Sequence, residues 1–147
     1  MTTKQKVLFL CVHNSARSQI AAALLNQTCG QFFEAQSAGL EPGILNSLAV
    51  EALQEIGIDI SKNKTQAVND VLKSGELFSY VITVCSESEA EGCPVFPGVT
   101  TRLHWPFPDP SKLIGTREEK MKGVREIRER ICGHVEQFCE EHCPKHV

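Results

Sequence analysis

The sequence predicts an α/β fold, a three-layer sandwich in which a central four-stranded parallel sheet is flanked by helices. Two observations predict it. Along the 147 residues, apolar segments of strand length alternate with segments of helical apolar spacing, and this order is typical of a parallel sheet covered by helices. The first strand segment, 5–11, is continuously apolar after a polar start, as expected of a strand buried on both faces.

The other elements follow in chain order. After residue 15 we expect a helix with Ile20, Ala23, Leu24 and Thr28 along one side. Then come a strand over 33–38, a helix over 45–56 that ends at Gly57, a short helix around 66–74, strands over 80–84 and 100–105, and a final helix. The final helix is the clearest, because Met121, Val124, Ile127, Ile131, Val135 and Phe138 form one apolar stripe.

Length and charge restrict the kind of protein. The chain fits one domain over residues 1–147, and its formal net charge of −3 gives no reason to expect nucleic acid or an acidic membrane as partner. No apolar run approaches the roughly 20 residues of a membrane span, and the stretch 7–12 is too short for a signal peptide. We therefore expect a cytoplasmic monomer whose seven cysteines form no structural disulfide framework.

The segment after the first strand has the pattern of an oxyanion-binding loop. It reads Cys11-Val12-His13-Asn14-Ser15-Ala16-Arg17-Ser18. Backbone N–H groups converge where a strand leads through a short loop into a helix, and there they favour a thiolate and hold a tetrahedral oxyanion. The planar guanidinium of Arg17 matches two oxygens of phosphate or arsenate. Asn14 is expected to fix the curve of the loop and Ser18 to donate to the Cys11 sulfur.

Asp109 is the candidate proton donor. It lies in His104-Trp105-Pro106-Phe107-Pro108-Asp109-Pro110, a loop that its prolines hold in a restricted range of conformations. A general acid above the Cys11 loop needs such fixed placement, beside the apolar side chains of Trp105 and Phe107. The alternative is an aspartate that caps an Asx turn and has no chemical role. We interpret His104 as a structural or rim residue.

Cys85 and Cys93 are the other candidate reactive thiols. Cys85 follows the third predicted strand, and an acidic, glycine-containing segment that we expect to be mobile leads from it to Cys93. Such mobility suits thiol–disulfide exchange, in which two sulfurs must approach to about 2 Å. The alternative is two incidental cysteines. A zinc site is disfavoured because no histidine lies between them.

The chain resembles the low-molecular-weight tyrosine phosphatases and, within that superfamily, the thioredoxin-coupled arsenate reductases. The resemblance rests on segments 7–18, 37–39 and 57–61 and on the pair Asp109-Pro110. It implies that Cys11 attacks the oxyanion centre, Arg17 binds it and Asp109 protonates the leaving oxygen. In the reductases it further implies that Cys85 releases arsenite by forming a disulfide with Cys11. Cys93 then forms a disulfide with Cys85, which thioredoxin, or in its place glutaredoxin, reduces.

The resemblance fails at the cation site that several of these reductases have. Asn14, Ser37 and Thr65 fill the neutral positions, but Ala22 and Ala67 replace the acidic ones. We therefore expect no metal, no cofactor and an enzyme that is insensitive to salt or stabilised by sulfate or another oxyanion.

The remaining cysteines are interpreted as structural. Cys29 is expected to be a half-buried thiol at the end of the first helix, and Cys132 and Cys139 to face the core. Cys139 and Cys143 are one helical turn apart, so a metal or redox role of the tail is the alternative to an exposed, frayed terminus.

Three functions compete. The leading prediction is reduction of arsenate, a thiol-dependent oxidoreductase reaction. The second is hydrolysis of tyrosine phosphate, which needs only Cys11, Arg17 and Asp109. The third is a non-catalytic oxyanion or thiol sensor, which would keep Cys11 and tolerate the loss of Asp109.

Overall fold

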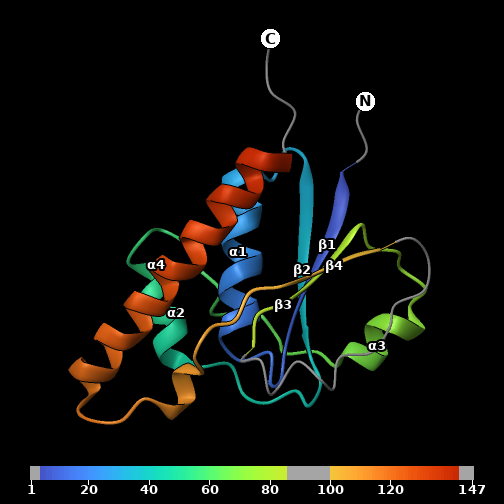
Figure 1. The fold of residues 1–147 in the computed structure, drawn as a ribbon. Coiled ribbons are helices and arrows are strands. Elements are labelled where there is room, and N and C mark those ends of the chain that lie inside the picture. Colours follow the sequence, from blue (N-terminus) through green and yellow to red (C-terminus); the bar gives the residue numbers. More distant parts are fainter. Residues whose placement is uncertain (1–3, 86–99, 143–147) are drawn as a thin grey trace.

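The computed structural model describes residues 4–85 and 100–142 and contains a four-stranded parallel sheet with the strand order β2-β1-β3-β4 (Figure 1). The strands are β1 (Gln5–Cys11), β2 (Phe33–Gly39), β3 (Tyr80–Thr83) and β4 (Thr101–His104). All three pairings are parallel. The predicted α/β sandwich is confirmed.

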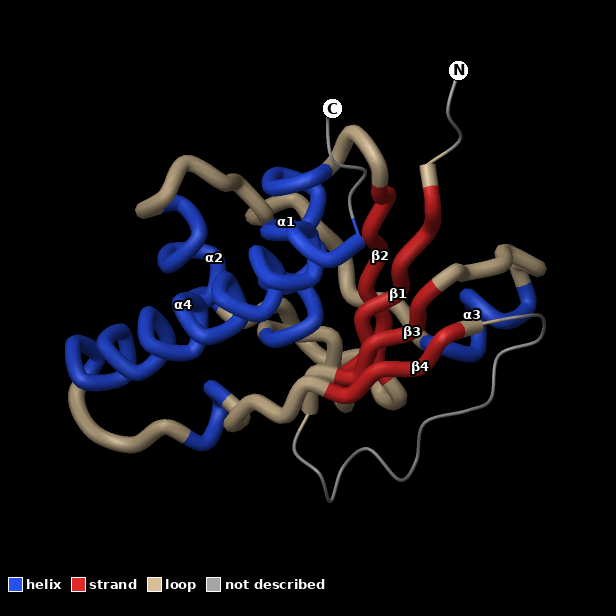
Figure 2. The backbone as a smooth tube through the Cα atoms, turned by 45° about the horizontal axis from the view of Figure 1, so that its top comes forward, coloured by secondary structure: helices blue, strands red, loops and turns tan. Residues whose placement is uncertain are grey.

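Helices cover both faces of this sheet. The helices are α1 (Arg17–Cys29), α2 (Ser47–Gln54), α3 (Val68–Lys73) and α4 (Arg117–His142), and a short 3-10 helix spans Pro110–Lys112. Figures 1 and 2 show α1, α2 and α4 on one side of the sheet and α3 on the other. Asn46 caps α2, because its side-chain oxygen accepts hydrogen bonds from the backbone N–H groups of Leu48 and Ala49.

The core has one part on each side of the sheet. Between the sheet and α1 and α4 lie Phe9, Phe33 and Ile82, together with Ile20 and Leu25 of α1. All six residues of the apolar stripe predicted for α4 are buried. On the other side, Leu8, Leu10 and Val81 meet Val68 and Val71 of α3. Some details differ from prediction: Thr28 is exposed, the buried face of α1 ends at Cys29, and α2 is shorter than the helix predicted over 45–56.

The register of the sheet brings the ends of β1, β2 and β3 together. Cys11 pairs with Gly39 across β1 and β2, and Leu10 pairs with Thr83 across β1 and β3. The Val84 N–H donates to the Leu10 carbonyl at 2.8 Å. Cys11 and Cys85 therefore both lie at the carboxyl edge of adjacent strands, where ligands bind in sheets of this kind.

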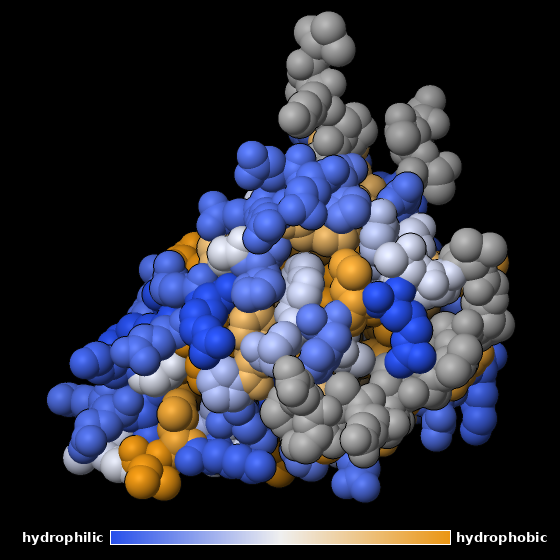
Figure 3. Space-filling model, viewed as in Figure 1, coloured by the Kyte–Doolittle hydropathy of each residue, from blue (hydrophilic) through white to orange (hydrophobic). Residues whose placement is uncertain are grey.

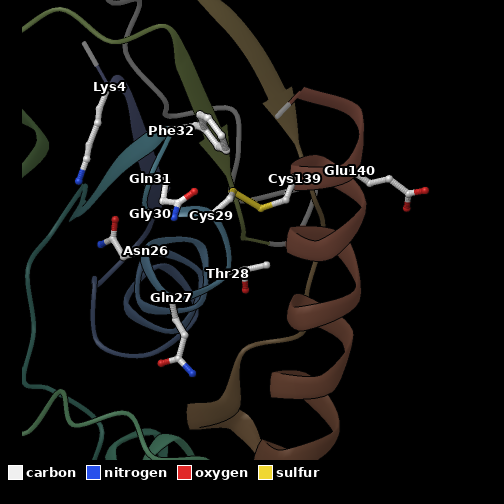
Figure 4. A pocket seen from close by; sticks show the side chains of 10 residues that line it. All are labelled: Lys4, Asn26, Gln27, Thr28, Cys29, Gly30, Gln31, Phe32, Cys139 and Glu140. Carbon is white, nitrogen blue, oxygen red and sulfur yellow. A yellow bond between two sulfur atoms is a disulfide. The ribbon is translucent and has the colours of Figure 1, made fainter. Parts of the chain in front are cut away.

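A disulfide joins Cys29 and Cys139, which corrects the expectations that Cys29 is a half-buried thiol and that the cysteines have no structural disulfide role. The two Cα atoms are 6.1 Å apart and 110 residues separate them in sequence. Figure 4 shows the bond crossing from the end of α1 to α4 at the wall of a pocket. The pocket is lined by Lys4, Asn26, Gln27, Thr28, Cys29, Gly30, Gln31, Phe32, Cys139 and Glu140. The prediction failed because the crossing of α1 and α4 juxtaposes cysteines that no local pattern relates.

Charged side chains hold α2 against α4. The carboxylate of Glu55 receives hydrogen bonds from Arg125 at 2.7–3.0 Å and from Arg128 at 3.0 Å, and Arg128 also donates to the carbonyl of Ala52 at 2.7 Å. The hydrogen bond from Arg125 is the main cause that lowers the pKa of Glu55 to about 2.

Hydrophilic side chains dominate the face seen in Figure 3. Within the described ranges, no helix has the length and apolar character to cross a membrane.

Candidate active site

The sulfur of Cys11 lies at the centre of the loop that follows β1. Cys11 is buried, and its sulfur accepts a hydrogen bond from the backbone N–H of Asn14 at 3.1 Å. The Ser18 hydroxyl lies 3.0 Å from the same sulfur. The Asn14 side-chain amide donates to Ser18 Oγ at 2.7 Å, and the hydroxyl hydrogen is free to point at the sulfur. Two donors on one sulfur favour the thiolate, the form that acts as a nucleophile.

Asn14 sets the curve of the loop, as the sequence predicted. Its φ of 55° lies in the left-handed region, which asparagine tolerates better than most residues do. The side chain is fully buried, and its oxygen accepts a hydrogen bond from the Gln66 N–H at 3.0 Å. The helix α1 begins at Arg17, two residues after the predicted start near Ser15.

Gly39 on β2 allows the loop to lie close to the sheet. A Cβ at this position would be 2.8 Å from both the Asn14 nitrogen and the Val12 carbonyl oxygen. Both are backbone atoms of the loop and cannot move aside without moving the loop itself. The close approach therefore requires glycine. No local pattern in the sequence predicted this role of Gly39.

The carbonyl groups of the loop bond to the segment that follows β2. Glu41 N donates to Val12 O, Gly43 N to His13 O, and Asn46 N to Ser15 O, at 2.8–2.9 Å. Carbonyl oxygens that are bonded outward leave the inner side of the loop to N–H groups, which suits an anion.

Arg17 and Asp109 meet beside the loop. Arg17 is 3% exposed, donates from Nη1 to the Phe107 carbonyl at 3.2 Å, and places Nη2 3.7 Å from Asp109 Oδ2. The other oxygen, Asp109 Oδ1, caps the 3-10 helix by accepting from Ser111 N at 2.9 Å and from Ser111 Oγ at 2.8 Å. Asp109 therefore forms the Asx turn of the structural alternative and also faces the guanidinium, as the general-acid hypothesis requires.

Aromatic side chains support the segment that carries Asp109. Phe107 is 1% exposed and its ring lies edge-on to His134, with centroids 5.0 Å apart. Trp105 packs on Phe9 of β1 at 5.7 Å. His104 bonds to the Thr83 hydroxyl at 2.6 Å on the neighbouring strand, which fits its structural interpretation. These contacts fix the approach of the Asp109 segment to the sheet edge.

The structure brings four of the five predicted catalytic residues to one edge of the sheet. Cys85 is buried, lies two residues after the end of β3 and belongs to the same apolar cluster as Cys11. Cys93 lies outside the described residues. Cys132 is half-buried on α4, and burial together with the nearby Glu136 carboxylate raises the pKa of its thiol. This places Cys132 among thiols that react slowly at neutral pH.

Two of the three neutral residues considered for a cation site, Asn14 and Thr65, have other partners. The Thr65 hydroxyl donates to the Gly43 carbonyl at 2.7 Å, and the Asn14 side-chain oxygen is occupied as described above. Among the residues with described positions, no group of three or more histidine, cysteine, aspartate or glutamate side chains gathers as metal ligands would.

Comparisons with known proteins agree with this geometry. The family model of the low molecular weight phosphotyrosine protein phosphatases matches residues 6–145. An arsenate reductase of Bacillus subtilis is 38% identical over 135 residues, 91% of this chain and 94% of that protein. A solved arsenate reductase of Archaeoglobus fulgidus is 34% identical, with a TM-score of 0.66 over 88% of this chain and 98% of that one.

A longer solved chain is also similar. It is a thioredoxin-dependent arsenate reductase of Corynebacterium glutamicum, 31% identical, with a TM-score of 0.70. The match covers 95% of the present chain and 62% of that chain.

Proposed function

The chain belongs to the low molecular weight phosphotyrosine protein phosphatase family, and within this family we propose that it is a thioredoxin-dependent arsenate reductase. The observation that carries the proposal is the position of Cys85, a second buried cysteine that follows β3, the strand next to β1, at the same sheet edge as Cys11. A phosphatase has no use for it. The arsenate reductases that are 31–38% identical to this chain support the same activity.

The first step is attack by the Cys11 thiolate on arsenic. The loop N–H groups and the Arg17 guanidinium hold the arsenate oxygens, and Asp109 protonates the oxygen that leaves as water. The closeness of Arg17 Nη2 to Asp109 Oδ2, 3.7 Å, supports this assignment. It puts the acid beside the group that binds the oxygens of the substrate. The product is a covalent Cys11–arsenate adduct.

The second step supplies the two electrons. Cys85 attacks the Cys11 sulfur, the sulfur–arsenic bond breaks, and its electron pair stays on arsenic, which leaves as arsenite. A Cys11–Cys85 disulfide remains. Cys93 then attacks Cys85 and releases the Cys11 thiolate. Thioredoxin, or glutaredoxin in its place, reduces the Cys85–Cys93 disulfide. Since Cys85 is buried, its exchange with Cys93 and with thioredoxin requires the segment at the end of β3 to open.

The alternative is a phosphatase that acts on tyrosine phosphate. The Cys11 loop, Arg17 and Asp109 suit that reaction equally well, and the family description names it. The two functions differ only in their need for the further thiols, so substitutions of those thiols separate them.

The test measures three activities of each variant. These are arsenite formed per enzyme in a single turnover, NADPH-coupled turnover with thioredoxin and thioredoxin reductase, and hydrolysis of p-nitrophenyl phosphate. Cys85→Ser should form no arsenite. Cys93→Ser should form about one arsenite per enzyme and then stop. Cys132→Ser is the matched control and should turn over normally. Steady turnover by the Cys85→Ser or Cys93→Ser variant would contradict the relay.

The proposed relay also leads to a cellular compartment and an oligomeric state. A relay that ends in a thioredoxin-reducible disulfide works in the cytoplasm, where thiols are kept reduced. We propose a monomer made of one domain, residues 1–147, and the extent of the family match supports the single domain.

A further inference from the structure

Gln19, which follows the predicted loop on α1, is buried although it is polar. Its side chain is 2% exposed, and its amide nitrogen lies among three oxygen atoms. These are the Asn14 carbonyl at 3.1 Å, the Asn14 side-chain oxygen at 3.2 Å and the Lys64 carbonyl at 3.3 Å. An amide nitrogen carries only two hydrogens, so one hydrogen is shared between two of these acceptors. The Gln19 amide therefore bonds to the backbone and the side chain of Asn14 and connects Asn14 to Lys64.

Asn63 reinforces the orientation in which the Gln19 amide nitrogen faces Asn14. Its side-chain nitrogen donates to the Gln19 oxygen at 3.0 Å. Without Asn63, the Gln19 side-chain oxygen would lose a hydrogen bond that favours this orientation of the amide. The reversed orientation would set the Gln19 oxygen against three other oxygens, which is unfavourable.

The hydrogen bonds form a continuous chain that ends at sulfur. Asn63 donates to Gln19, Gln19 to the Asn14 side-chain oxygen, and Asn14 to Ser18. The Ser18 hydroxyl lies at 3.0 Å from the Cys11 sulfur. Each donor points toward Cys11, and bonds aligned in this way polarise one another and strengthen the last of them. The chain starts at an exposed residue and ends at the buried nucleophile.

We infer that Gln19 and Asn63 are positioning residues that hold Asn14 and Ser18 in the arrangement that stabilises the Cys11 thiolate. Neither touches the sulfur, so both act through Asn14. The inference rests on the proposed role of Cys11 as the nucleophile. It adds two residues, outside the loop itself, on which the reactivity of that nucleophile depends.

The test measures the thiol directly, without arsenate. The protein is alkylated with iodoacetamide at pH 7, and the rate at Cys11 is divided by the rate at Cys132 in the same sample, by peptide mass spectrometry. Gln19→Met keeps the length of the side chain and removes its donors. It should lower the ratio by up to about tenfold, the effect of losing one neutral buried hydrogen bond. Asn63→Ala should lower it roughly threefold, because it leaves the Gln19 amide in place but less well oriented.

Two comparisons separate positioning from general stability. Gln36→Met is the control. It removes a hydrogen bond from the Gln36 side-chain amide to Glu76, 2.7 Å long, that has no link to the loop, and it should leave the alkylation ratio unchanged. Because Asn63 acts only through Gln19, adding Asn63→Ala to Gln19→Met should have no further effect.

The outcomes are decisive whether or not arsenate is the substrate. A Gln19→Met protein with a lower Tm and an unchanged alkylation ratio would overturn the inference. If Gln19→Met does not fold, the exposed Asn63 decides alone, and a wild-type ratio in Asn63→Ala has the same force. A lowered ratio in the variants, together with a wild-type protein that fails to reduce arsenate, would support the inference and refute the proposed activity.

Discussion

Loss of the Cys29–Cys139 disulfide should remove a large part of the stability of the oxidised protein. The disulfide connects cysteines 110 residues apart, and in the chain-entropy treatment a loop of that size is worth about 4.8 kcal/mol. Measured effects often fall below this value. We therefore expect Cys139→Ser to lower the free energy of unfolding by about 2–5 kcal/mol. For a chain of this length the loss corresponds to a fall in Tm of roughly 5–20 °C.

The assay is urea unfolding followed by circular dichroism. Every protein carries Cys85→Ser, so that the proposed relay disulfide cannot form and dithiothreitol acts on the structural one alone. Cys132→Ser, the same substitution on the same helix, should leave stability within about 0.5 kcal/mol. Dithiothreitol should bring the parent protein down to the level of Cys139→Ser and should not lower that variant further. Equal stability of the parent and Cys139→Ser under oxidising conditions would refute the reasoning.

Three further predictions concern the loop, the acid and the α2–α4 contact. Gly39→Ala should lower single-turnover arsenite formation at least a hundredfold, because the new Cβ meets the backbone of Asn14 at 2.8 Å; wild-type activity would show that the loop can move. Asp109→Asn should lower kcat by about 10²–10⁴, as expected for a general acid, while phosphate still binds in titration calorimetry. Arg125 holds the pKa of Glu55 at about 2 when folded, against an ordinary value of 4.5. The pair therefore stabilises the fold above pH 4.5, and urea unfolding should show the advantage over Glu55→Gln disappearing as the pH falls toward 2.

Local patterns predicted those parts of the fold and site that depend on neighbours in sequence. The apolar run of β1 and the apolar stripe of α4 predict directly which of their residues are buried. The segment from Cys11 to Ser18 combines a strand end, a short loop and a helix start, so its conformation follows from chemistry within eight positions. The meeting of Arg17 with Asp109, ninety-two positions away, is the exception, and it agrees with a parallel sheet because each residue lies in the segment that follows the carboxyl end of a strand.

Contacts between separate segments were not predictable in the same way. The bond between Gln19 and Asn63 depends on how the segment before α3 packs against the loop. Nothing next to Gln19 in the sequence distinguishes a buried amide from an exposed one on the polar face of a helix. The pairing of Cys29 with Cys139 depends likewise on the crossing of two helices.

The disulfide between α1 and α4 changes what a thiol titration of this protein counts. The chain has seven cysteines, and two of them are occupied by each other, so at most five thiols are left for a reagent added to the denatured, unreduced protein. Each enzyme that completes the proposed relay once, without thioredoxin, should lose two more. A stoichiometric count before and after arsenate would then report the fraction of competent enzyme in a preparation.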